Sequence, residues 1–592
     1  MSKHDTWPGN PIENLSFGTI IEVDGTHIVA ELDTDIAELS RVYGGVIYPI
    51  GQFGSIIRIH FGRRVLFAYV SRLRMKVEYD RERGMLPDSN PTARVIEADL
   101  FGEGEWLPAS SDQSWKLTFD RGITTFPLPQ QRVYLTPRKD LGEIFGQGSS
   151  CGILIGEHVG AAGTLAYADM DELLGKHTAI LGSTGSGKSG TVASLIHAVL
   201  ERGSEAKYGD WNPRVVILDP HNEYGAAFPD AVRMSTDEGT LQLPYWMLDF
   251  EETASLFVGH TEHAATSQTN IIRNALLEAR KEGAVAIGMD AEEITVDSPV
   301  PYKMGNAVGL DEFGQSPDGE PRDGFVGAVN SLRPSGQDRR KHEDYTKVLR
   351  KLATLQNDSR LQFMMTSWEG ESDDFSNIAG QLLGQGAPVR IIDLSGVPSE
   401  VAGAASSAIA RLLFMVKVWQ FPDERKSSPV LLVCEEAHRY VPNRGEAMYA
   451  AAQAAIQRIA KEGRKYGIGL LLVSQRPSEV DATVLSQCNS WIVLRTTNDA
   501  DRDHVRAILP DSLAGLTRVL SGLRRREAIF VGQATLLPTR ILIRELSQEQ
   551  LPDSHDISFD EGWQNANLTD TQLTEIAQRW RLQVRGASTQ RE

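Results

Sequence analysis

Residues 1–165 alternate short apolar runs with glycines. The segments 17–32 (FGTIIEVDGTHIVAEL) and 44–73 (GGVIYPIGQFGSIIRIHFGRRVLFAYVSRL) combine alternating apolar residues, β-branched residues and glycine at turns or bulges. The strand-like pieces SWKLTFD, QRVYL and CGILIGEHV continue this pattern. We therefore predict a small N-terminal β-barrel or sandwich over residues 1–165.

A different pattern begins at about residue 166, where buried strands alternate with helices. Six near-continuous apolar runs are bounded by glycine or polar residues: KHTAILG, RVVILDP, VRIIDLSG, VLLVCEE, IGLLLVSQ and SWIVLRT. Such runs are typical of a parallel sheet that is covered on both faces. The pattern predicts an α/β domain over residues 166–545.

A long interruption separates the second of these strands from the third, at about residues 240–385. It contains two stretches with helical patterns, EHAATSQTNIIRNALLEARKEG and EDYTKVLRKLATLQNDSRLQF, which indicate an inserted helical subdomain. Between them, residues 288–324 are rich in glycine, proline and acidic residues, and we predict an exposed loop there. The polar tail, residues 546–592, ends in a helical pattern, TDTQLTEIAQRWRLQ.

Composition narrows the class of protein. The 592 residues are 41% hydrophobic and 23% charged, as in globular proteins, and are too many for a single core. No uninterrupted apolar run approaches the ~18 residues of a membrane span. The N-terminus lacks a secretory pattern, and the three cysteines, Cys151, Cys434 and Cys488, are far apart in the sequence. We expect a cytoplasmic protein without a disulfide framework, a cysteine-based metal site or a membrane segment.

The net charge of −19 argues, taken alone, against nucleic-acid binding, because phosphate neutralisation requires lysine and arginine. A ring-shaped protein can, however, be acidic outside and basic along a narrow pore. Net charge therefore does not exclude a protein that encircles DNA.

The segment GSTGSGKS, residues 182–189, follows an apolar strand and precedes a helical run. It matches the phosphate-binding loop pattern G-x-x-x-x-G-K-[ST]. Glycines allow backbone N–H groups to face phosphate oxygens, Lys188 supplies a cation to the β- and γ-phosphates, and Ser189 can ligate Mg²⁺. The alternative is a flexible linker that contains Lys-Ser by chance. We predict that ATP and Mg²⁺ bind through this loop, which comprises Gly182, Ser183, Thr184, Gly185, Ser186, Gly187, Lys188 and Ser189.

Two adjacent carboxylates end the strand in LLVCEEAHRY, residues 431–440. A phosphate-binding loop requires an acidic partner near the metal and, in hydrolases, a group that activates water. Glu435 stands where the metal-associated carboxylate is expected, and Glu436 follows it. Because strand side chains alternate, we expect the two to face different directions and to have different roles. The alternative is an exposed acidic strand end.

A second acidic segment is VVILDPHNEY, residues 215–224. Asp219 and Glu223 follow a strand at the edge where ligands bind in open α/β sheets. The sequence around His221 and Asn222 is also a favourable turn, and both interpretations stay open.

The segment KEGRKYGIGLLLVSQRPSEV, residues 461–480, contains a strand that ends at Gln475. A glutamine there can hydrogen-bond a γ-phosphate or the attacking water. Arg458, Arg464 and Lys465 precede this strand on a predicted helix, and an arginine that reaches a neighbouring subunit's site can stabilise transition-state charge. The alternative for each of the three is a solvated surface residue.

These segments in order resemble one family. GSTGSGKS preceded by Lys-His, DPHNEY, EEAHRYVP, EGRKYGIGLLLVSQRPSEVD and LSQCNSWIVLRTTNDADRDHV together resemble HerA, the hexameric DNA translocase and helicase ATPase related to the FtsK pumps. The resemblance covers most of residues 14–545, including the GLRRREAIFVGQATLLPTRILI ending. It implies a RecA-like P-loop core with an inserted helical subdomain, preceded by the family's HAS-type β-barrel.

The resemblance also implies a homohexameric ring around double-stranded DNA, with each ATP site at a subunit interface. Glu436 would then be the catalytic glutamate and Gln475 the phosphate sensor. Lys176, where the family commonly has arginine, and Arg464 would act in trans. Family members work with a NurA-type nuclease in repair, or with a sirtuin-like NAD-hydrolysing effector in antiphage operons, which would dock on the barrel face.

Two other functions remain as alternatives. The first is a scaffold or regulatory ATPase ring that assembles and activates an effector enzyme, with DNA movement secondary. The second is a P-loop kinase or small-molecule transferase, which the inserted domain, the sensor glutamine and the candidate arginines disfavour. Stimulation of ATP hydrolysis by duplex DNA separates the motor from the scaffold.

Overall fold

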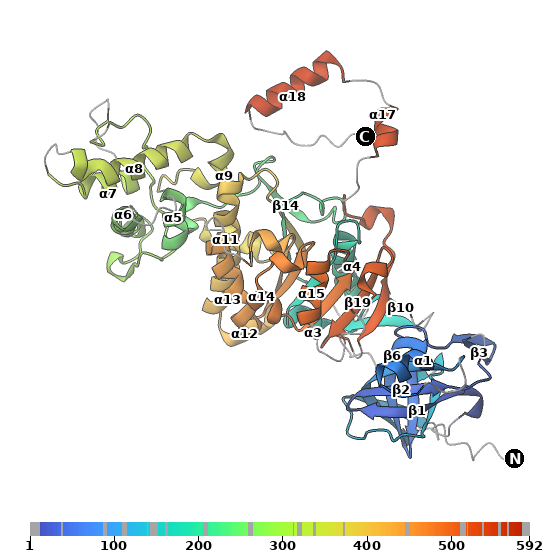
Figure 1. Ribbon diagram of the computed structural model, residues 1–592. Helices are drawn as coiled ribbons and strands as arrows, with labels where there is room; N and C mark the ends of the chain where they lie inside the picture. The colour runs from blue at the N-terminus through green and yellow to red at the C-terminus, as the bar shows by residue number, and fades with distance from the viewer. Residues whose placement is uncertain are drawn as a thin grey trace. The chain divides into compact units, whose positions relative to one another are not determined.

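The computed structural model describes most of the 592 residues: 12–36, 39–86, 92–108, 115–138, 140–142, 152–159, 164–204, 211–258, 265–311, 313–316, 323–335, 339–370, 373–443, 450–508, 517, 519–535, 538–553, 558–564 and 568–582. The chain forms two compact units (Figure 1). Unit 1 comprises Met1–Arg202, Gln475–Ser478 and Cys488–Leu546, and unit 2 comprises Gly203–Ser474, Glu479–Gln487 and Ser547–Glu592.

Unit 1 begins with a closed β-barrel, drawn in blue in Figure 1. The strands pair in the order β2-β1-β9-β5-β6-β7, and β7 pairs back to β2, which closes a six-stranded ring. Strand β8 extends from β7, and β3 pairs with β4 in a separate hairpin. The bounds are β1 Ser16–Asp24, β2 His27–Leu32, β3 Ser40–Tyr43, β4 Val46–Pro49, β5 Ile56–Phe61, β6 Arg64–Met75, β7 Arg94–Pro108, β8 Trp115–Arg121 and β9 Arg132–Leu135.

Apolar residues that alternate along these strands fill the barrel. Buried members of this core include Phe17, Ile28, Ile57, Leu66, Ile96 and Val133. The predicted N-terminal β module is therefore present, and it is a barrel rather than a sandwich.

The rest of unit 1 is a mixed sheet in the order β11-β10-β20-β19-β18-β12. Its strands are β10 Gly152–His158, β11 Leu165–Asp169, β12 Thr178–Leu181, β18 Ser490–Leu494, β19 Glu527–Gly532 and β20 Thr539–Ile543. β12 and β18 are parallel, and the other pairs are antiparallel.

One strand assignment made from the sequence is wrong. CGILIGEHV was assigned to the N-terminal β module, but β10 pairs with β20, where Gly156 lies opposite Ile543. The strand after the barrel's β9 therefore belongs to the α/β sheet. Local periodicity does not reveal a partner strand at the far end of the chain.

Unit 2 contains the all-parallel sheet that the apolar runs predict, in the order β17-β16-β13-β15-β14. The strands are β13 Val215–Asp219, β14 Val232–Ser235, β15 Val389–Asp393, β16 Val430–Cys434 and β17 Ile468–Ser474. All residues of β13, β15, β16 and β17 are buried. The sequence analysis missed β14, which is a short strand at the end of this order.

The predicted helical insertion is present between β14 and β15. It comprises α5 Phe250–Phe257, α6 Ala265–Ala286, α7 Gly324–Ser331, α8 Arg339–Gln356, α9 Gln362–Met365 and α10 Phe375–Leu382. The two helical stretches expected from the sequence correspond to α6 and α8. The capping box of Asp249 and Glu252 fixes the start of α5.

The prediction of an exposed loop over residues 288–324 is wrong for much of its described part. Ile294, Val300, Tyr302 and Met304 are buried, and Ile294 and Val300 pack with Ala284 of α6. The hydroxyl of Tyr245 also donates to the carbonyl of Tyr302 (2.6 Å). The prediction was based on the acidic and glycine-rich composition of the stretch, which gave little weight to its few apolar residues.

Helix α11 (Ser399–Trp419) lies beside α13 (Ala450–Tyr466) in Figure 1. In the described part of the chain, its Val401–Trp419 stretch is the one helix long and apolar enough to cross a membrane, with a mean hydropathy of 1.6. However, 78% of the stretch is buried inside the protein. Arg411 in its middle pairs with Glu252 of α5 (2.8 Å), as expected of a core helix.

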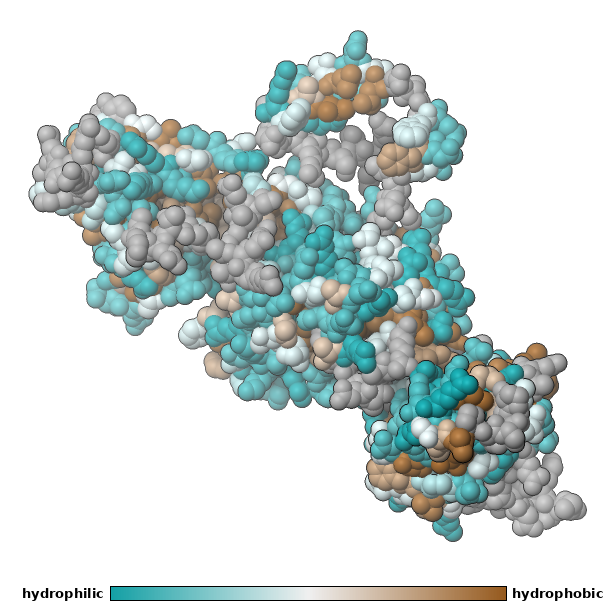
Figure 2. All heavy atoms as spheres, in the orientation of Figure 1, coloured by the Kyte–Doolittle hydropathy of each residue, from teal (hydrophilic) through white to brown (hydrophobic). Residues whose placement is uncertain are grey.

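The tail contains α17 (Phe559–Trp563) and α18 (Asp570–Leu582), and α18 confirms the predicted C-terminal helix. Hydrophobic side chains gather on α18 (Figure 2), where Leu573, Ile576 and Trp580 are exposed. Cys434 and Cys488 are buried and form no disulfide, whereas Cys151 lies outside the described residues.

Candidate nucleotide-binding and catalytic site

The loop between β12 and α4 (Lys188–Glu201) has the backbone of a phosphate cradle. Gly185 (φ +72°) and Gly187 (φ +103°) adopt conformations that side chains rarely permit. A Cβ on Gly182 would lie 2.7 Å from Ser186 Oγ and 2.9 Å from Leu494 Cβ. These three glycines are therefore required for the loop to turn tightly at the start of α4.

Residues just after β18 and just before β19 brace this loop from within unit 1. The Ser183 N–H donates to the carbonyl of Arg495 (2.9 Å), and the Thr497 N–H donates to Ser183 Oγ (3.1 Å). The Arg526 N–H donates to the Ser186 carbonyl (3.2 Å). Arg526 itself has a left-handed backbone (φ +68°), a strained conformation that often occurs at functional sites.

Lys188 and Ser189 form the first turn of α4, where helix N–H groups and the helix dipole favour anions. Lys188 is buried, and its Nζ donates to the Ser183 carbonyl at 3.4 Å, a long hydrogen bond. Ser186 Oγ is buried and has no hydrogen-bond partner among the described residues. This loop therefore fits a nucleotide's phosphates.

Gln475 lies at the same loop. The Thr184 hydroxyl donates to its side-chain carbonyl (2.7 Å), so the structure brings the predicted sensor and the predicted phosphate loop together. No group of three or more His, Cys, Asp or Glu side chains within the described ranges could hold a metal alone. Within unit 1, the hydroxyl of Ser189 is a group that can ligate Mg²⁺ together with a nucleotide's own phosphates.

Glu435 and Glu436, in unit 2, lie beyond the end of β16, which stops at Cys434. Glu436 has a left-handed backbone (φ +53°, ψ +50°). The sequence analysis predicted that the two side chains face different directions because strand side chains alternate. This reason is wrong, because a turn separates the two residues. Glu435 is 3% exposed and Glu436 is 7% exposed, which excludes the alternative of an exposed acidic strand end.

Glu435 accepts a hydrogen bond from a buried tyrosine of the DPHNEY segment. The Tyr224 hydroxyl donates to Glu435 Oε2 at 2.6 Å. Burial, together with the negative charge of Glu435, raises the pKa of Tyr224 well above its usual value. Tyr224 therefore stays protonated and fixes the orientation of this carboxylate.

The Glu436 carboxylate has few polar neighbours. Its Oε2 lies 3.3 Å from Nδ1 of His438 but makes no hydrogen bond of regular geometry with the described residues. The His438 ring is also 3.3 Å from the Ser474 hydroxyl. A buried carboxylate with an oxygen available can accept a proton from a water molecule.

Asp219 organises the DPHNEY turn. It is fully buried and accepts the backbone N–H groups of His221 (3.2 Å) and Tyr224 (3.0 Å). Burial raises the pKa of Asp219, and these N–H groups oppose that rise. The Asp219 carboxylate therefore stabilises the turn that was considered for His221 and Asn222. Asn222 also serves this turn, with φ +57°.

The candidate basic residues have different surroundings. Lys176, after α3 (Met170–Gly175), donates to Gln533 (2.9 Å) and pairs with Glu172 (2.6 Å). Arg464 and Lys465 are exposed in the last turn of α13. The guanidinium of Arg458 lies 4.7 Å from the ring centroid of Phe414, which favours a packing role.

Comparison with known proteins agrees with these motifs. Residues 153–413 match the family model "Helicase HerA, central domain". The DNA double-strand break repair helicase HerA of Sulfolobus acidocaldarius is 26% identical over 447 residues, 74% of this chain and 78% of the relative. The probable DNA double-strand break repair helicase HerA of Methanocaldococcus jannaschii is 25% identical over 450 residues, 70% and 80% of the two chains. The chain is therefore similar to HerA helicases, in its central domain and over most of its length. ATP hydrolysis is the activity that this similarity supports.

Two solved structures are similar to this chain. VirB4 of Thermoanaerobacter pseudethanolicus has a TM-score of 0.45 at 16% identity and covers 68% of this chain and 98% of its own. The plasmid coupling protein TrwB in complex with ADP and Mg²⁺ has a TM-score of 0.44 at 16% identity, with coverages of 70% and 94%.

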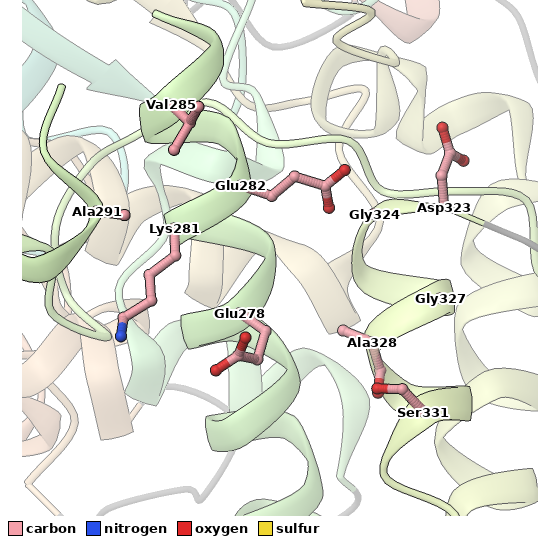
Figure 3. Close-up of a pocket in the computed structure, with 10 residues that line it drawn as sticks. All are labelled: Glu278, Lys281, Glu282, Val285, Ala291, Asp323, Gly324, Gly327, Ala328 and Ser331. Atoms are coloured by element: carbon pink, nitrogen blue, oxygen red, sulfur yellow. The ribbon is translucent and has the colours of Figure 1, made fainter. Parts of the chain in front are cut away.

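A concave surface away from the phosphate loop lies between α6 and α7 in the helical insertion (Figure 3). Its volume is about 500 Å³. Glu278, Glu282 and Asp323 surround it, and Lys281 is the single lysine among its lining residues. This excess of acidic groups would repel a triphosphate, so the surface is not the nucleotide site.

Three residues that contact the candidate site residues had no role in the sequence analysis. Tyr224 orients Glu435, and the backbones of Thr497 and Arg526 brace the phosphate loop. All three fall in segments that resemble the family, but their contacts join positions far apart in the chain. No local sequence signal predicts the left-handed backbones of Glu436 and Arg526.

Proposed function

We propose that this protein is an ATP-hydrolysing motor that forms a hexameric ring and translocates on or unwinds double-stranded DNA. One observation carries the proposal: a phosphate loop with the required glycine backbone, braced beside Gln475, occurs in a chain that is similar to HerA helicases.

In this proposal Gly182 through Ser189 hold the phosphates, and Ser189 and Glu435 hold Mg²⁺. The bound metal would neutralise phosphate charge. Glu436 accepts the proton of the attacking water, and its burial with an open oxygen supports that role. Gln475 orients the γ-phosphate or the water through its side-chain amide.

We further propose that Arg464 acts on the site of a neighbouring subunit. Its exposure at the end of α13 supports this role. Lys176 is the second residue proposed to act in trans, and it must exchange its contacts with Glu172 and Gln533 for a phosphate. As a point charge it binds phosphate with less directionality than arginine.

The proposed partners are duplex DNA in the central pore and an enzyme docked on the barrel face. That enzyme is a NurA-type nuclease in DNA end processing or a sirtuin-like effector in antiphage defence. The names of the relatives, double-strand break repair helicases, support the repair setting. We place the protein in the cytoplasm, and the thiols of Cys434 and Cys488, which form no disulfide, agree with a reducing compartment.

The test is ATP hydrolysis by the full chain with and without duplex DNA, together with Glu436→Gln and Lys188→Ala variants. We expect DNA to stimulate turnover. Glu436→Gln should bind ATP but hydrolyse it at least about 100-fold more slowly, because proton acceptance is lost while the phosphate loop remains. Lys188→Ala should lose ATP binding.

Two results would contradict the proposal. Turnover that duplex DNA leaves unchanged would favour the scaffold or regulatory ring over the motor. Loss of ATP affinity in Glu436→Gln would show that Glu436 belongs to the binding loop and not to the chemistry.

A further inference from the structure

The Glu436 carboxylate, which is proposed to accept a proton from water, depends on being aimed. A general base works only within hydrogen-bond reach of its proton, and a displacement of about 1 Å can cost about 100-fold in rate. The neighbouring Glu435 is oriented by the Tyr224 hydroxyl, which donates to Glu435 Oε2. Glu436 has a different polar neighbour, the ring of His438.

The Nδ1 atom of His438 faces two oxygens of unit 2. It lies 3.3 Å from Glu436 Oε2 and 3.3 Å from the Ser474 hydroxyl oxygen. An ionised carboxylate only accepts hydrogen bonds, so the contact with Glu436 is favourable when Nδ1 carries its hydrogen. The same hydrogen can be donated to Ser474, because a hydroxyl oxygen also accepts. One N–H group of His438 is therefore shared between the two oxygens.

The backbone that carries Glu436 and His438 is tightly held. Residues Ala437–Arg439 form the short 3₁₀ helix η6, and Glu436 precedes it with a left-handed backbone (φ +53°). The N–H groups of Arg439 and Tyr440 donate to the carbonyls of Glu436 (2.8 Å) and Ala437 (3.0 Å). Strain of this kind is frequent at functional sites. The fold therefore fixes where the ring and the carboxylate stand relative to one another.

Ser474 holds the other side of the ring. It is the last residue of β17 and is fully buried. In contrast, the His438 side chain is 15% exposed and the Glu436 side chain is 9% exposed. The ring is therefore anchored on a buried strand on one side, while the carboxylate stays within reach of water. This arrangement suits a group that orients a carboxylate better than one that fills a core.

We infer that His438 is a positioning residue for Glu436, whose Oε2 it aims at the attacking water through Nδ1–H. The inference rests on the proposed function, in which Glu436 accepts the proton of that water. The contact of 3.3 Å is long, and catalytic hydrogen bonds often reach their best alignment only in the reacting complex. In that complex the shared N–H donates to Glu436 instead of Ser474. A free lone pair of the carboxylate then takes the proton.

The experiment measures kcat and KM for ATP with the full chain and duplex DNA. His438→Leu and His438→Asn have nearly the same shape, but only asparagine can place an N–H group at the δ position. We expect kcat of His438→Leu to fall at least ~10-fold, while ATP-analogue affinity stays within ~2-fold of wild type, because the phosphate loop is intact. His438→Asn should recover kcat to within ~3-fold of wild type, because the donor is restored.

The matched control is His504→Leu in α15 (Asp499–Ile508), which replaces another half-buried histidine. It should keep the wild-type kcat and KM. A fall in kcat as large as that of His438→Leu would show that losing any half-buried histidine is enough, and would overturn the inference.

A double-mutant cycle separates positioning from packing. If His438 acts through Glu436, His438→Leu should slow a Glu436→Gln protein by no more than ~2-fold, because the base that it aims is already lost. A packing defect would instead slow both proteins by the same factor. Single-turnover hydrolysis of ATP is the readout, since it remains measurable in slow variants.

Wild-type turnover in His438→Leu overturns the inference, and so do equal losses in the leucine and asparagine variants or additive losses in the double variant. If thermal unfolding shows that His438→Leu does not fold, His438→Gln replaces it, because its amide lies one bond farther from the backbone. Equal turnover in the glutamine and asparagine variants then overturns the inference. Failure of the proposed function looks different, since the wild type would hydrolyse no ATP with DNA present, or Glu436→Gln would retain turnover.

Discussion

At the scale of single residues, the two adjacent glutamates have different surroundings because a left-handed turn separates them. Glu435 is oriented by the Tyr224 hydroxyl, and Glu436 keeps an oxygen without a regular hydrogen bond in the described structure. Tyr224 is in turn held by Asp219 through its backbone N–H. The DPHNEY segment therefore acts on the site through Glu435.

Replacing Tyr224 with Phe should remove this orientation and leave the ring in place. The buried Glu435 carboxylate would lose a charge-assisted hydrogen bond, which costs about 1–3 kcal/mol. We expect the Mg²⁺ concentration for half-maximal turnover to rise several-fold, and the unfolding temperature to fall. The measurement is a Mg²⁺ titration of ATP hydrolysis alongside thermal unfolding.

The control is Tyr302→Phe, because the Tyr302 hydroxyl is buried and makes no hydrogen bond among the described residues. That change should leave the Mg²⁺ dependence unaltered. An unaltered Mg²⁺ titration in Tyr224→Phe would show that the tyrosine serves folding alone.

At the scale of elements, the phosphate loop is set by glycine backbone, and this can be tested on two nearby glycines. Gly187 has φ +103°, whereas Gly190 lies within α4 and a Cβ there would meet nothing within 4 Å. Gly187→Ala should strain the loop by about 1–3 kcal/mol and weaken ATP binding at least ~10-fold. Gly190→Ala should stay within ~2-fold of wild type, because alanine favours the helix. Equal affinities in an ATP-analogue titration would contradict the assigned loop conformation.

Strand β10 adds a pH dependence to the stability of unit 1. Burial lowers the pKa of His158 from its usual 6.5 to about 4, and its ring contacts the Thr539 hydroxyl (2.9 Å). Between these two values the unfolded chain binds a proton that the folded chain does not. Above about pH 6.5, protonation of His158 therefore does not lower the free energy of unfolding. As the pH drops toward 4, this free energy falls, by about 2 kcal/mol at pH 5.

His158→Gln should remove this dependence. We expect the unfolding temperature of the wild type to fall more steeply between pH 7 and pH 5 than that of the variant, as measured by scanning calorimetry. Parallel pH profiles for the two proteins would show that His158 is accessible to protons in the folded state.

At the scale of the whole molecule, Arg464 precedes β17 and Glu436 follows β16, which places them at opposite edges of the parallel sheet and predicts complementation between inactive subunits. A Glu436→Gln copy retains Arg464, and an Arg464→Ala copy retains Glu436. If Arg464 acts in trans, mixing the two variants in equal amounts gives about a quarter of the interfaces both a wild-type Glu436 and a wild-type Arg464. We expect turnover to reach roughly that share of the wild-type rate. Mixed rings with no restored ATP hydrolysis would remove the support for action in trans.

The sequence by itself determined the elements and the chemical groups of this protein. Apolar periodicity located the barrel strands, the buried strands of the α/β sheet and helices α6, α8 and α18, because burial imposes a local pattern on each element. The spacing of GSTGSGKS located the phosphate loop, because cradle glycines, lysine and serine must be close in sequence. These features depend on neighbours within a few residues.

The tertiary structure decided what the distant contacts are. It paired β10 with β20, joined Tyr224 to Glu435 across 211 positions, buried Ile294 and Tyr302 in an acidic stretch, and placed Arg464 at the far edge from Glu436. It also gave Glu436 its left-handed backbone. Such contacts depend on which surfaces meet after folding, and a short sequence pattern contains no information about a partner hundreds of residues away.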